Sequence, residues 1–374
     1  MSIKQQGKKR LVAVGIGLLF ILLCIVGYNV FMTSEKKEVL KKTSSMSQYD
    51  YMVKVLADAF SGYAVIRSDR MAKDLKRQRV KLNVISDNAN YEERLQALID
   101  GKADMAVFTV DALIKASVKL GKWPASIVMV FDETKGADAM VAFKPAVSSI
   151  QDLDNPNACI VATPNSPSEF VARIVLAQFS LISMPDKWLV EAKGAEGVLK
   201  KMEAADRSAK CAYVMWEPYV SKALKLPGAH ILLDTSKVKG LVVDVWVARR
   251  EYINEHPERV KVVMESYFRA AHSYREETNG MVNLVKKDSN GTLTEAEAKK
   301  IVAGIHWKTT MDNYAHFGLV PEDQRGGISH LEDSIERVID VMIKTGSLKK
   351  HPLKGKVNTL FYTGAIQAFH DSGF

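Results

Sequence analysis

Short apolar runs alternate with amphipathic segments along the chain from residue 51 onwards. Four apolar runs bounded by turn residues are predicted as strands: residues 51–57, 81–86, 104–110 and 126–131. Three segments between them have the apolar spacing of helices: residues 64–79, 91–100 and 111–120, the second of which ends at Gly101. Strands that alternate with single helices indicate parallel βαβ units.

The same alternation returns in the middle of the chain. Strands are predicted at residues 158–162, 188–192 and 211–215, with helices at residues 168–183 and 195–205. Two further extended runs, residues 140–144 and 241–248, are predicted to cross between the two α/β units. The chain after residue 248 is predicted to be mostly helical.

One C-terminal helix has both a start signal and a stop signal. Ser329 and Glu332 have the spacing of a capping box. The residues that follow form one apolar helix face: Ile335, Val338, Ile339, Met342 and Ile343. Gly346 is predicted to end this helix.

The first fifty residues have a different pattern. Residues 11–32 contain no charged residue, and a run of 22 residues is long enough to cross a bilayer as a helix. No small-x-small cleavage motif follows it. We therefore expect an uncleaved transmembrane anchor at residues 11–32, a cytoplasmic tail at residues 1–10 and a polar tether at residues 33–48. The lysine-rich flanks favour contact with anionic headgroups.

The composition is typical of a folded protein with two domains. The chain has 374 residues, of which 47% are apolar and 25% are charged. Its formal net charge of +9 owes much to the flanks of residues 11–32. No basic–aromatic stripe and no zinc or helix-turn-helix motif accompanies this charge, so nucleic-acid binding is not expected.

Several motifs, in their order along the chain, resemble segments of substrate-binding proteins for nitrate, sulfonate and taurine uptake. They are residues 95–113, residues 162–170, residues 216–219 and residues 253–270, and the resemblance covers roughly residues 51–271. It implies a type II periplasmic binding protein: two doubly wound α/β lobes joined by two hinge crossings, with a helical C-terminal part. Lobe 1 would comprise residues 49–144 and 245–374, and lobe 2 residues 145–244.

Ligands of open parallel sheets bind outside the carboxyl ends of the strands, and four stretches of this chain fall there. The candidate ligand-binding residues are Phe60, Ser61, Tyr63, Thr109, Asp111, Thr163, Asn165, Ser166, Ser168, Trp216, Glu217 and Asp244. Trp216 and Glu217 reach a cleft only if residues 211–215 form the central strand of their unit. A Trp packed beneath the lobe is the alternative, and residues 60–63 also fit a plain turn with a buried Tyr.

Two of these stretches also fit helix caps. Ser166, Pro167 and Glu169 have the spacing of N-cap, N1 and N3 in a capping box. The same helix start, if it faces a cleft, would suit a sulfonate, phosphate or carboxylate. Thr109 or Asp111 fits the cap of the helix that follows it.

Cys159 and Cys211 each open a predicted strand of the second α/β unit. The first and third strands of such a unit are usually neighbours, about 4.7–4.9 Å apart. Their sulfurs can bond if both side chains point to the same face, and an oxidising periplasm would permit this disulfide. Two buried free thiols are the alternative.

No catalytic constellation is present in the sequence. There is no nucleophile elbow, no phosphate-binding Gly-rich loop and no His at metal-ligand spacing. The related pyrimidine synthase of thiamine biosynthesis needs a Cys cluster, whereas this chain has three Cys in all. We therefore expect neither an enzyme nor a bound metal or cofactor.

The sequence predicts a solute-binding protein tethered to the bacterial inner membrane, with most of the chain in the periplasm. Its lobes would close on a small polar molecule, a sulfonate, amine or oxoanion, and hand it to an ABC-type transport partner. Asp132, Asp138 and Asp244 lie near the crossings and favour an amine over a bare anion. The alternative is a structural or regulatory subunit that uses this fold as a docking module in a membrane complex.

Overall fold

The computed structural model describes residues 48–374. The predicted cytoplasmic tail, the predicted anchor at residues 11–32 and the tether up to residue 47 lie outside the described residues. Within residues 48–374, no helix is long and apolar enough to cross a membrane. Met52–Phe374 form one unit, and this unit contains two β-sheets.

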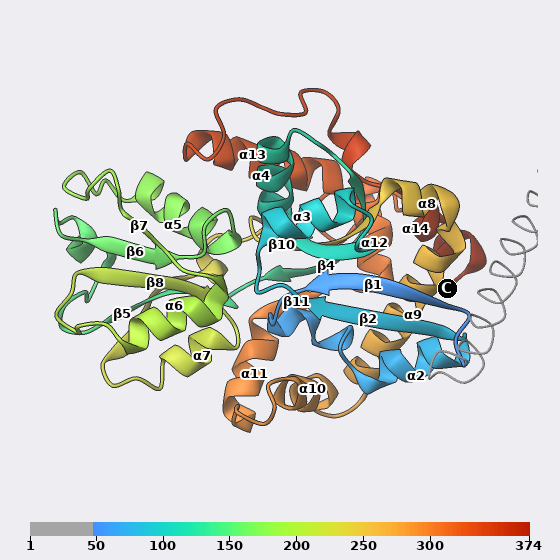
Figure 1. Cartoon of the computed structure of the whole chain (residues 1–374), viewed down its shortest axis with the longest axis horizontal. Helices are drawn as coiled ribbons and strands as arrows, with labels where there is room; N and C mark the ends of the chain where they lie inside the picture. The colour runs from blue at the N-terminus through green and yellow to red at the C-terminus, as the bar shows by residue number, and fades with distance from the viewer. Residues whose placement is uncertain (1–47) are drawn as a thin grey trace, which may run out of the picture. The chain divides into compact units, whose positions relative to one another are not determined.

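The first sheet has six strands in the order β11-β4-β10-β3-β1-β2 (Figure 1). Its strands are β1 (Tyr51–Ala57), β2 (Val80–Ser86), β3 (Met105–Thr109), β4 (Ala125–Thr134), β10 (Val243–Arg249) and β11 (Ile305–Trp307). β1 and β3 are parallel, as the βαβ pattern predicts, whereas β10 runs antiparallel to both β3 and β4. β3 is buried along its whole length, which explains its apolar sequence.

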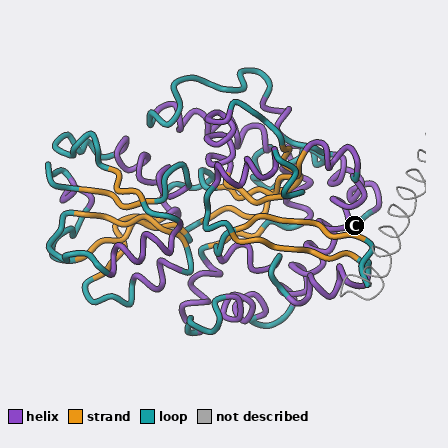
Figure 2. Tube along the Cα trace, in the orientation of Figure 1, coloured by secondary structure: helices purple, strands orange, loops and turns teal. Residues whose placement is uncertain are grey.

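The second sheet has five strands in the order β7-β6-β8-β5-β9, and Figure 2 shows its strands beside those of the first sheet. Its strands are β5 (Asp138–Phe143), β6 (Cys159–Ala162), β7 (Leu189–Glu191), β8 (Cys211–Trp216) and β9 (Ala229–Asp234). β6 pairs in parallel with β7 and β8, while β5 is antiparallel to β8 and β9. β8 is therefore the central strand, the condition under which Trp216 lies at a cleft.

The chain changes sheet twice. Between Thr134 and Asp138 it leaves β4 of the first sheet and enters β5 of the second. Between Asp234 and Val243 it returns from β9 to β10. The first change comes earlier than the crossing expected at residues 140–144, because β5 pairs with both of its neighbours in the second sheet.

Helices connect most of the strands and make up most of the C-terminal part. They are α2 (Asp69–Arg77), α3 (Tyr91–Ile99), α4 (Val110–Leu120), α5 (Pro167–Gln178), α6 (Gly194–Glu203), α7 (Tyr219–Ala223), α8 (Arg250–Glu255), α9 (Pro257–Glu276), α10 (Gly280–Asp288), α11 (Glu295–Ala303), α12 (Thr310–His316), α13 (Leu331–Lys344) and α14 (Gly364–Ser372). α5 and α6 both pack on β6 and β8 of the second sheet.

The helix predicted at residues 64–79 is broken in the structure. A 3₁₀ turn, η1 (Ser61–Val65), ends before Ser68. The Ser68 hydroxyl accepts a hydrogen bond from the Met71 N–H and so starts α2 separately. The break keeps η1 next to the carboxyl end of β1.

The capping box predicted at Ser329 is wrong. α13 begins at Leu331, and its N-cap is His330, whose Nδ1 accepts the Glu332 N–H at 3.2 Å. The helix itself and most of its apolar face are as predicted, with Ile335, Val338, Ile339 and Met342 buried.

A disulfide joins the two cysteines at the amino ends of β6 and β8. Cys159 and Cys211 are direct partners in the parallel pairing, and their Cα atoms are 4.5 Å apart. The bond spans 52 residues of the chain. Because ligands bind at the carboxyl ends of such strands, the disulfide lies at the opposite end of the sheet from a ligand.

Candidate ligand site between the two sheets

Strand ends from both sheets enclose a small buried space, which we call the inner chamber. It is lined by Asp58, Phe60, Tyr63, Tyr91, Thr109, Asp138, Pro167, Trp216, Val242 and Asp244. Thr109 and Trp216 are the last residues of β3 and β8, and Asp138 is the first residue of β5. Asp244 is paired with Thr109 across the antiparallel β3–β10 pair, which brings it to the same edge.

The inner chamber is nearly filled by its own side chains. It encloses about 210 Å³ between atoms, of which about 10 Å³ is open to the centre of a water molecule. That space fits about one water. A larger solute therefore enters only if the two sheets move apart.

Aromatic rings form one part of the wall. The rings of Phe60 and Tyr63 meet edge to face with their centroids 5.2 Å apart, and Tyr63 also packs on Phe131 at 5.8 Å. Trp216 is buried, with 3% of its surface exposed, and it reaches the chamber from the second sheet. The Tyr63 hydroxyl donates a hydrogen bond to Asp244 Oδ1, which fixes the ring and the carboxyl group together.

Carboxyl groups form a second part of the wall. Asp138 and Asp244 are 2% and 1% exposed. Asp138 Oδ2 and Asp244 Oδ2 are buried and accept no hydrogen bond from a protein donor. Burial, rather than any single neighbour, is the main cause that raises the pKa of Asp138 to about 7. Burial followed by the charge of Asp132 raises the pKa of Asp244 well above its ordinary value.

The third acid of the chamber wall is neutralised. Asp58 accepts a hydrogen bond at 3.1 Å from the Arg94 guanidinium, which is fully buried. Arg94 also pairs with Asp87 through two hydrogen bonds of 2.6 Å and 2.5 Å. Because these bonds occupy the guanidinium, Arg94 does not compensate the negative charge of Asp138 and Asp244.

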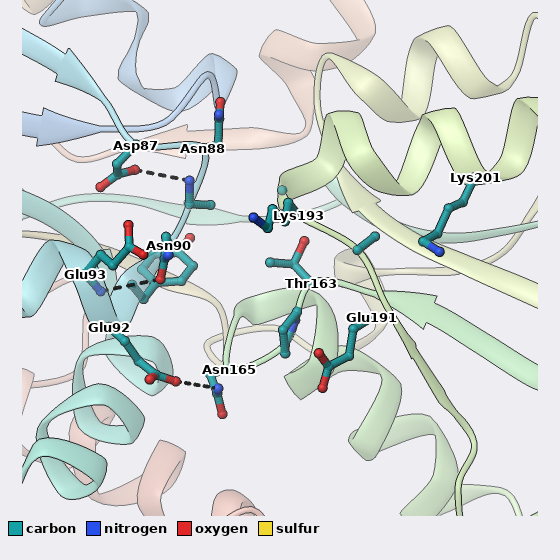
Figure 3. A pocket seen from close by; sticks show the side chains of 15 residues that line it. Asp87, Asn88, Asn90, Glu92, Glu93, Thr163, Asn165, Glu191, Lys193 and Lys201 are labelled. Carbon is teal, nitrogen blue, oxygen red and sulfur yellow. Dashed lines mark hydrogen bonds between the residues drawn. The ribbon is translucent and has the colours of Figure 1, made fainter.

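A wider depression, the outer groove, lies between α3 of the first sheet and the turns before α5 and α6 of the second. It has a volume of about 580 Å³ and shares Tyr91 with the inner chamber. Figure 3 shows Asp87, Asn88 and Glu92 on one side of it and Thr163, Glu191 and Lys193 on the other. The predicted residues Thr163 and Asn165 line this groove rather than the chamber.

A second depression, the rear groove, has a volume of about 640 Å³. It shares Asp58 with the inner chamber, and its wall includes Ser61, Arg67, Tyr219 and Lys222. The predicted residue Ser61 therefore faces the rear groove. Its N–H donates to the Glu217 carbonyl at 3.1 Å, a bond between the two sheet units.

The start of α5 is capped by its own residues. Ser166 is the N-cap and accepts the Ser168 N–H at 3.2 Å, while Glu169 accepts the Asn165 N–H at 2.6 Å. Pro167 has no N–H to offer. These hydrogen bonds support the interpretation of this motif as a helix cap. The start of α5 therefore does not present a free set of N–H donors to an anion.

Three further predicted residues lie outside the chamber wall. Glu217 accepts hydrogen bonds from the N–H and the hydroxyl of Ser221, at 3.0 Å and 2.9 Å, and so caps α7. Asp111 is buried in the first turn of α4, where burial raises its pKa to about 7. Ser168 is fully buried within α5. None of the three lines the inner chamber.

Five chamber residues were not among the predicted ligand-binding residues: Asp58, Tyr91, Asp138, Pro167 and Val242. Asp58 directly follows β1, and Tyr91 begins the helix after β2, so the rule of strand carboxyl ends applied to them as well. Pro167 lies in the helix start that the sequence placed at a strand end, whereas the position of Val242 depends on how the two sheets face each other. In residues 48–374, no group of three or more His, Cys, Asp or Glu is arranged to hold a metal ion.

No protein-family model and no curated protein sequence matches this chain. Solved structures of similar fold include a zinc-bound ligand-binding component of an ABC-type import system from Staphylococcus aureus, with 12% identity and a TM-score of 0.63 over 85% of this chain and 98% of that one. The alkanesulfonate-binding protein of Xanthomonas axonopodis pv. citri bound to MOPS has 15% identity and a TM-score of 0.62, over 84% and 99%.

A Candida albicans protein described as having the generic periplasmic binding protein fold is also similar. It has 11% identity and a TM-score of 0.65, over 83% of this chain and 95% of that one. At these identities the likeness is one of fold. The described residues of this chain therefore have the fold of periplasmic binding proteins, which is the fold that the sequence motifs implied.

Proposed function

We propose that this chain is a solute-binding protein, whose two lobes close on a small polar molecule and deliver it to an ABC-type uptake system. The observation that carries the proposal is the inner chamber, because strand ends of both sheets supply its walls. Two proteins of similar fold are described as a ligand-binding component of an ABC-type import system and as an alkanesulfonate-binding protein. Their solutes are not carried over, since the chamber residues of this chain select its own ligand.

The two lobes of this proposal correspond to the two sheets. The hinges are the segments between Thr134 and Asp138 and between Asp234 and Val243, where the chain passes from one sheet to the other. These segments lie close to the sequence-based lobe boundaries at residues 144 and 244. Rotation about two short segments separates the strand ends without disturbing either sheet.

Polar contacts between the lobes hold the arrangement closed. Besides the bond from Ser61 to Glu217, Asn165 Nδ2 donates to Glu92 Oε1 at 2.8 Å, and Lys225 pairs with Glu297 at 3.0 Å. The partly exposed ion pair contributes only about 0–1 kcal/mol, and each of the two hydrogen bonds about 0.5–1.5 kcal/mol net. We therefore assign most of the closing free energy to a solute that contacts both lobes in the chamber.

The proposal also includes the location of the protein. The apolar run at residues 11–32 would anchor the chain in the inner membrane and leave both lobes in the periplasm. The disulfide between Cys159 and Cys211 fits an oxidising compartment.

Native mass spectrometry of the full chain, purified in detergent, tests the proposal. We expect a small molecule bound at one copy per chain, which is lost in Trp216→Ala and kept in Trp188→Ala. Trp188 serves as the control because it belongs to the same sheet unit but does not line the chamber. A chain that carries no small molecule and instead retains a protein partner would support the docking-module alternative.

A further inference from the structure

We infer that the solute is a primary amine, held as its ammonium ion by Asp138 and Asp244 inside the inner chamber. The inference rests on the proposed function, since it names the ligand class of the same site. It assigns a positively charged ligand to this chain, although one similar fold is that of an alkanesulfonate-binding protein.

The charge of the chamber wall is the first argument. Three of the described lining residues are Asp, and none of them is Lys, Arg or His. Asp58 is paired with Arg94, whereas Asp138 and Asp244 face the chamber without a cationic partner on its wall. An anion placed there would add a like charge beside two buried carboxyl groups, which is costly in a low-dielectric site.

The second argument is hydrogen bonding. Asp138 and Asp244 are both more than nine-tenths buried and line the same small space, and Oδ2 of each accepts no bond from a protein donor. Buried polar atoms usually have partners, so two orphan acceptors in one chamber indicate a ligand that donates. A primary ammonium brings three N–H donors and the compensating positive charge. Thr109 lines the same space as a further polar residue.

The third argument is the aromatic wall. Phe60, Tyr63, Tyr91 and Trp216 surround the same space as the two carboxyl groups. Aromatic rings attract cations through their faces and also cover the carbon atoms of an alkylamine. Ca²⁺ and Mg²⁺ need about six oxygen ligands, so a wall half made of rings suits an organic cation better than a metal ion.

Isothermal titration calorimetry of the full chain in detergent tests the inference with matched probes. The amines are ethylamine, butylamine, ethanolamine and putrescine. Each is compared with the alcohol that has a hydroxyl in place of every amino group and with the corresponding sulfonate. We expect at least one amine to bind, with its alcohol at least about tenfold weaker and its sulfonate undetected.

Two variants locate the binding group. Asp138→Asn should weaken the amine at least about tenfold. Asp111→Asn is the matched control and should leave the affinity within about twofold. Like Asp138, Asp111 is buried, has a pKa raised to about 7 and has one carboxyl oxygen without a hydrogen-bond partner among the described residues. Unlike Asp138, it does not line the chamber. Asp244→Asn replaces Asp138→Asn if the latter does not fold, as judged by circular dichroism.

The outcomes separate this inference from the proposed function. A sulfonate or an alcohol that binds as tightly as its amine, with an affinity unchanged by Asp138→Asn, would overturn the amine inference and leave solute binding intact. Equal losses in Asp138→Asn and Asp111→Asn would also overturn it, because the effect would then not be specific to the chamber. Failure of every probe to bind would count against both.

Discussion

Asp132 on β4 lies directly opposite Asp244 on β10, and both carboxyl groups are buried in the first sheet. Burial and then the charge of Asp138 raise the pKa of Asp132 to about 8. The charge of Asp132 raises the pKa of Asp244, whereas Asp244 lowers the pKa of Asp132, so the two buried groups titrate together. A Cβ atom at Gly62 would lie 2.6 Å from Asp132 Oδ2, so the turn after β1 packs directly on this pair.

Replacement of Tyr63 by Phe should affect Asp244 specifically. The Tyr63 hydroxyl is the protein donor to Asp244 Oδ1, and this bond lowers the carboxyl pKa against the effect of burial. In Tyr63→Phe we expect the free energy of unfolding to fall by about 1–3 kcal/mol, because a buried acceptor loses its partner. Urea denaturation of the full chain measures this change, and Tyr267→Phe, in a buried Tyr of α9 whose hydroxyl has no hydrogen-bond partner in residues 48–374, is the comparison. An unchanged midpoint would show that the bond contributes nothing.

Amine binding should strengthen as the pH rises. Burial raises the pKa of Asp138 to about 7 and the pKa of Asp244 well above its ordinary value, so Asp138 is largely neutral in the free protein below about pH 6. A bound ammonium favours the ionised carboxylate, lowers the pKa and expels a proton. Affinity therefore increases from about pH 6 to about pH 9, by at most about tenfold per pH unit for each proton released.

Calorimetry in two buffers of different ionisation enthalpy detects this proton release. The charged groups near Asp132 act on its pKa in opposite directions, since Lys308 lowers it and Glu133 raises it. Asp58, Asp111 and Glu217 all raise the pKa of Asp138. An observed enthalpy that is the same in both buffers, with an affinity independent of pH, would contradict the prediction.

Trp216 and Ser166 should respond differently to truncation. Trp216 lines the chamber, and loss of an aromatic anchor weakens binding by on the order of 1–3 kcal/mol. Ser166 caps α5, so Ser166→Ala should lower the free energy of unfolding by about 1 kcal/mol and leave ligand affinity nearly unchanged. Titration and urea denaturation of both variants separate the two effects. Loss of affinity in Ser166→Ala without loss of stability would show that the start of α5 contacts the ligand.

The disulfide should stabilise the second lobe without affecting the ligand. A cross-link between Cys159 and Cys211 closes a loop of about fifty residues, which is worth about 4 kcal/mol in the chain-entropy model. We expect the paired variant Cys159→Ser with Cys211→Ser to unfold at lower urea concentration and to keep its amine affinity. Alkylation of the unfolded, unreduced protein provides the direct check. Labelling of both cysteines without reductant would show that the bond does not form.

The sequence predicted the two α/β units, because their alternating strands and helices depend on local pattern and order along the chain. Whether residues 211–215 form the central strand was left open by the sequence, and β8 is that strand, with β6 as its neighbour as expected. β9 and β11 escaped prediction. β9 is mostly half-buried and its apolar run, residues 231–233, is short, and β11 has only three residues within a helical region.

The roles of the site residues were harder to predict from the sequence than the fold was. Ser166 and Glu217 are residue types that serve equally as caps and as ligand contacts, and only the hydrogen bonds decide between the two. Asp138 and Asp244 come from strands of different sheets, so their meeting in one chamber depends on how the sheets face each other. The sequence favoured an amine only through the number of acids near the crossings. The orphan oxygen atoms that support this ligand class could not be predicted from it.

The central claim, that the two lobes close on a solute, is tested most directly by the distance between them. Glu93 and Lys201 are exposed on opposite sides of the outer groove and do not line the chamber. Spin labels at Glu93→Cys and Lys201→Cys, in a Cys24→Ser background, report this distance in the full chain by electron–electron double resonance. We predict a broad, longer distance in the free protein and a single shorter one when the amine that binds most tightly is added. An unchanged distance distribution at saturating amine would contradict closure.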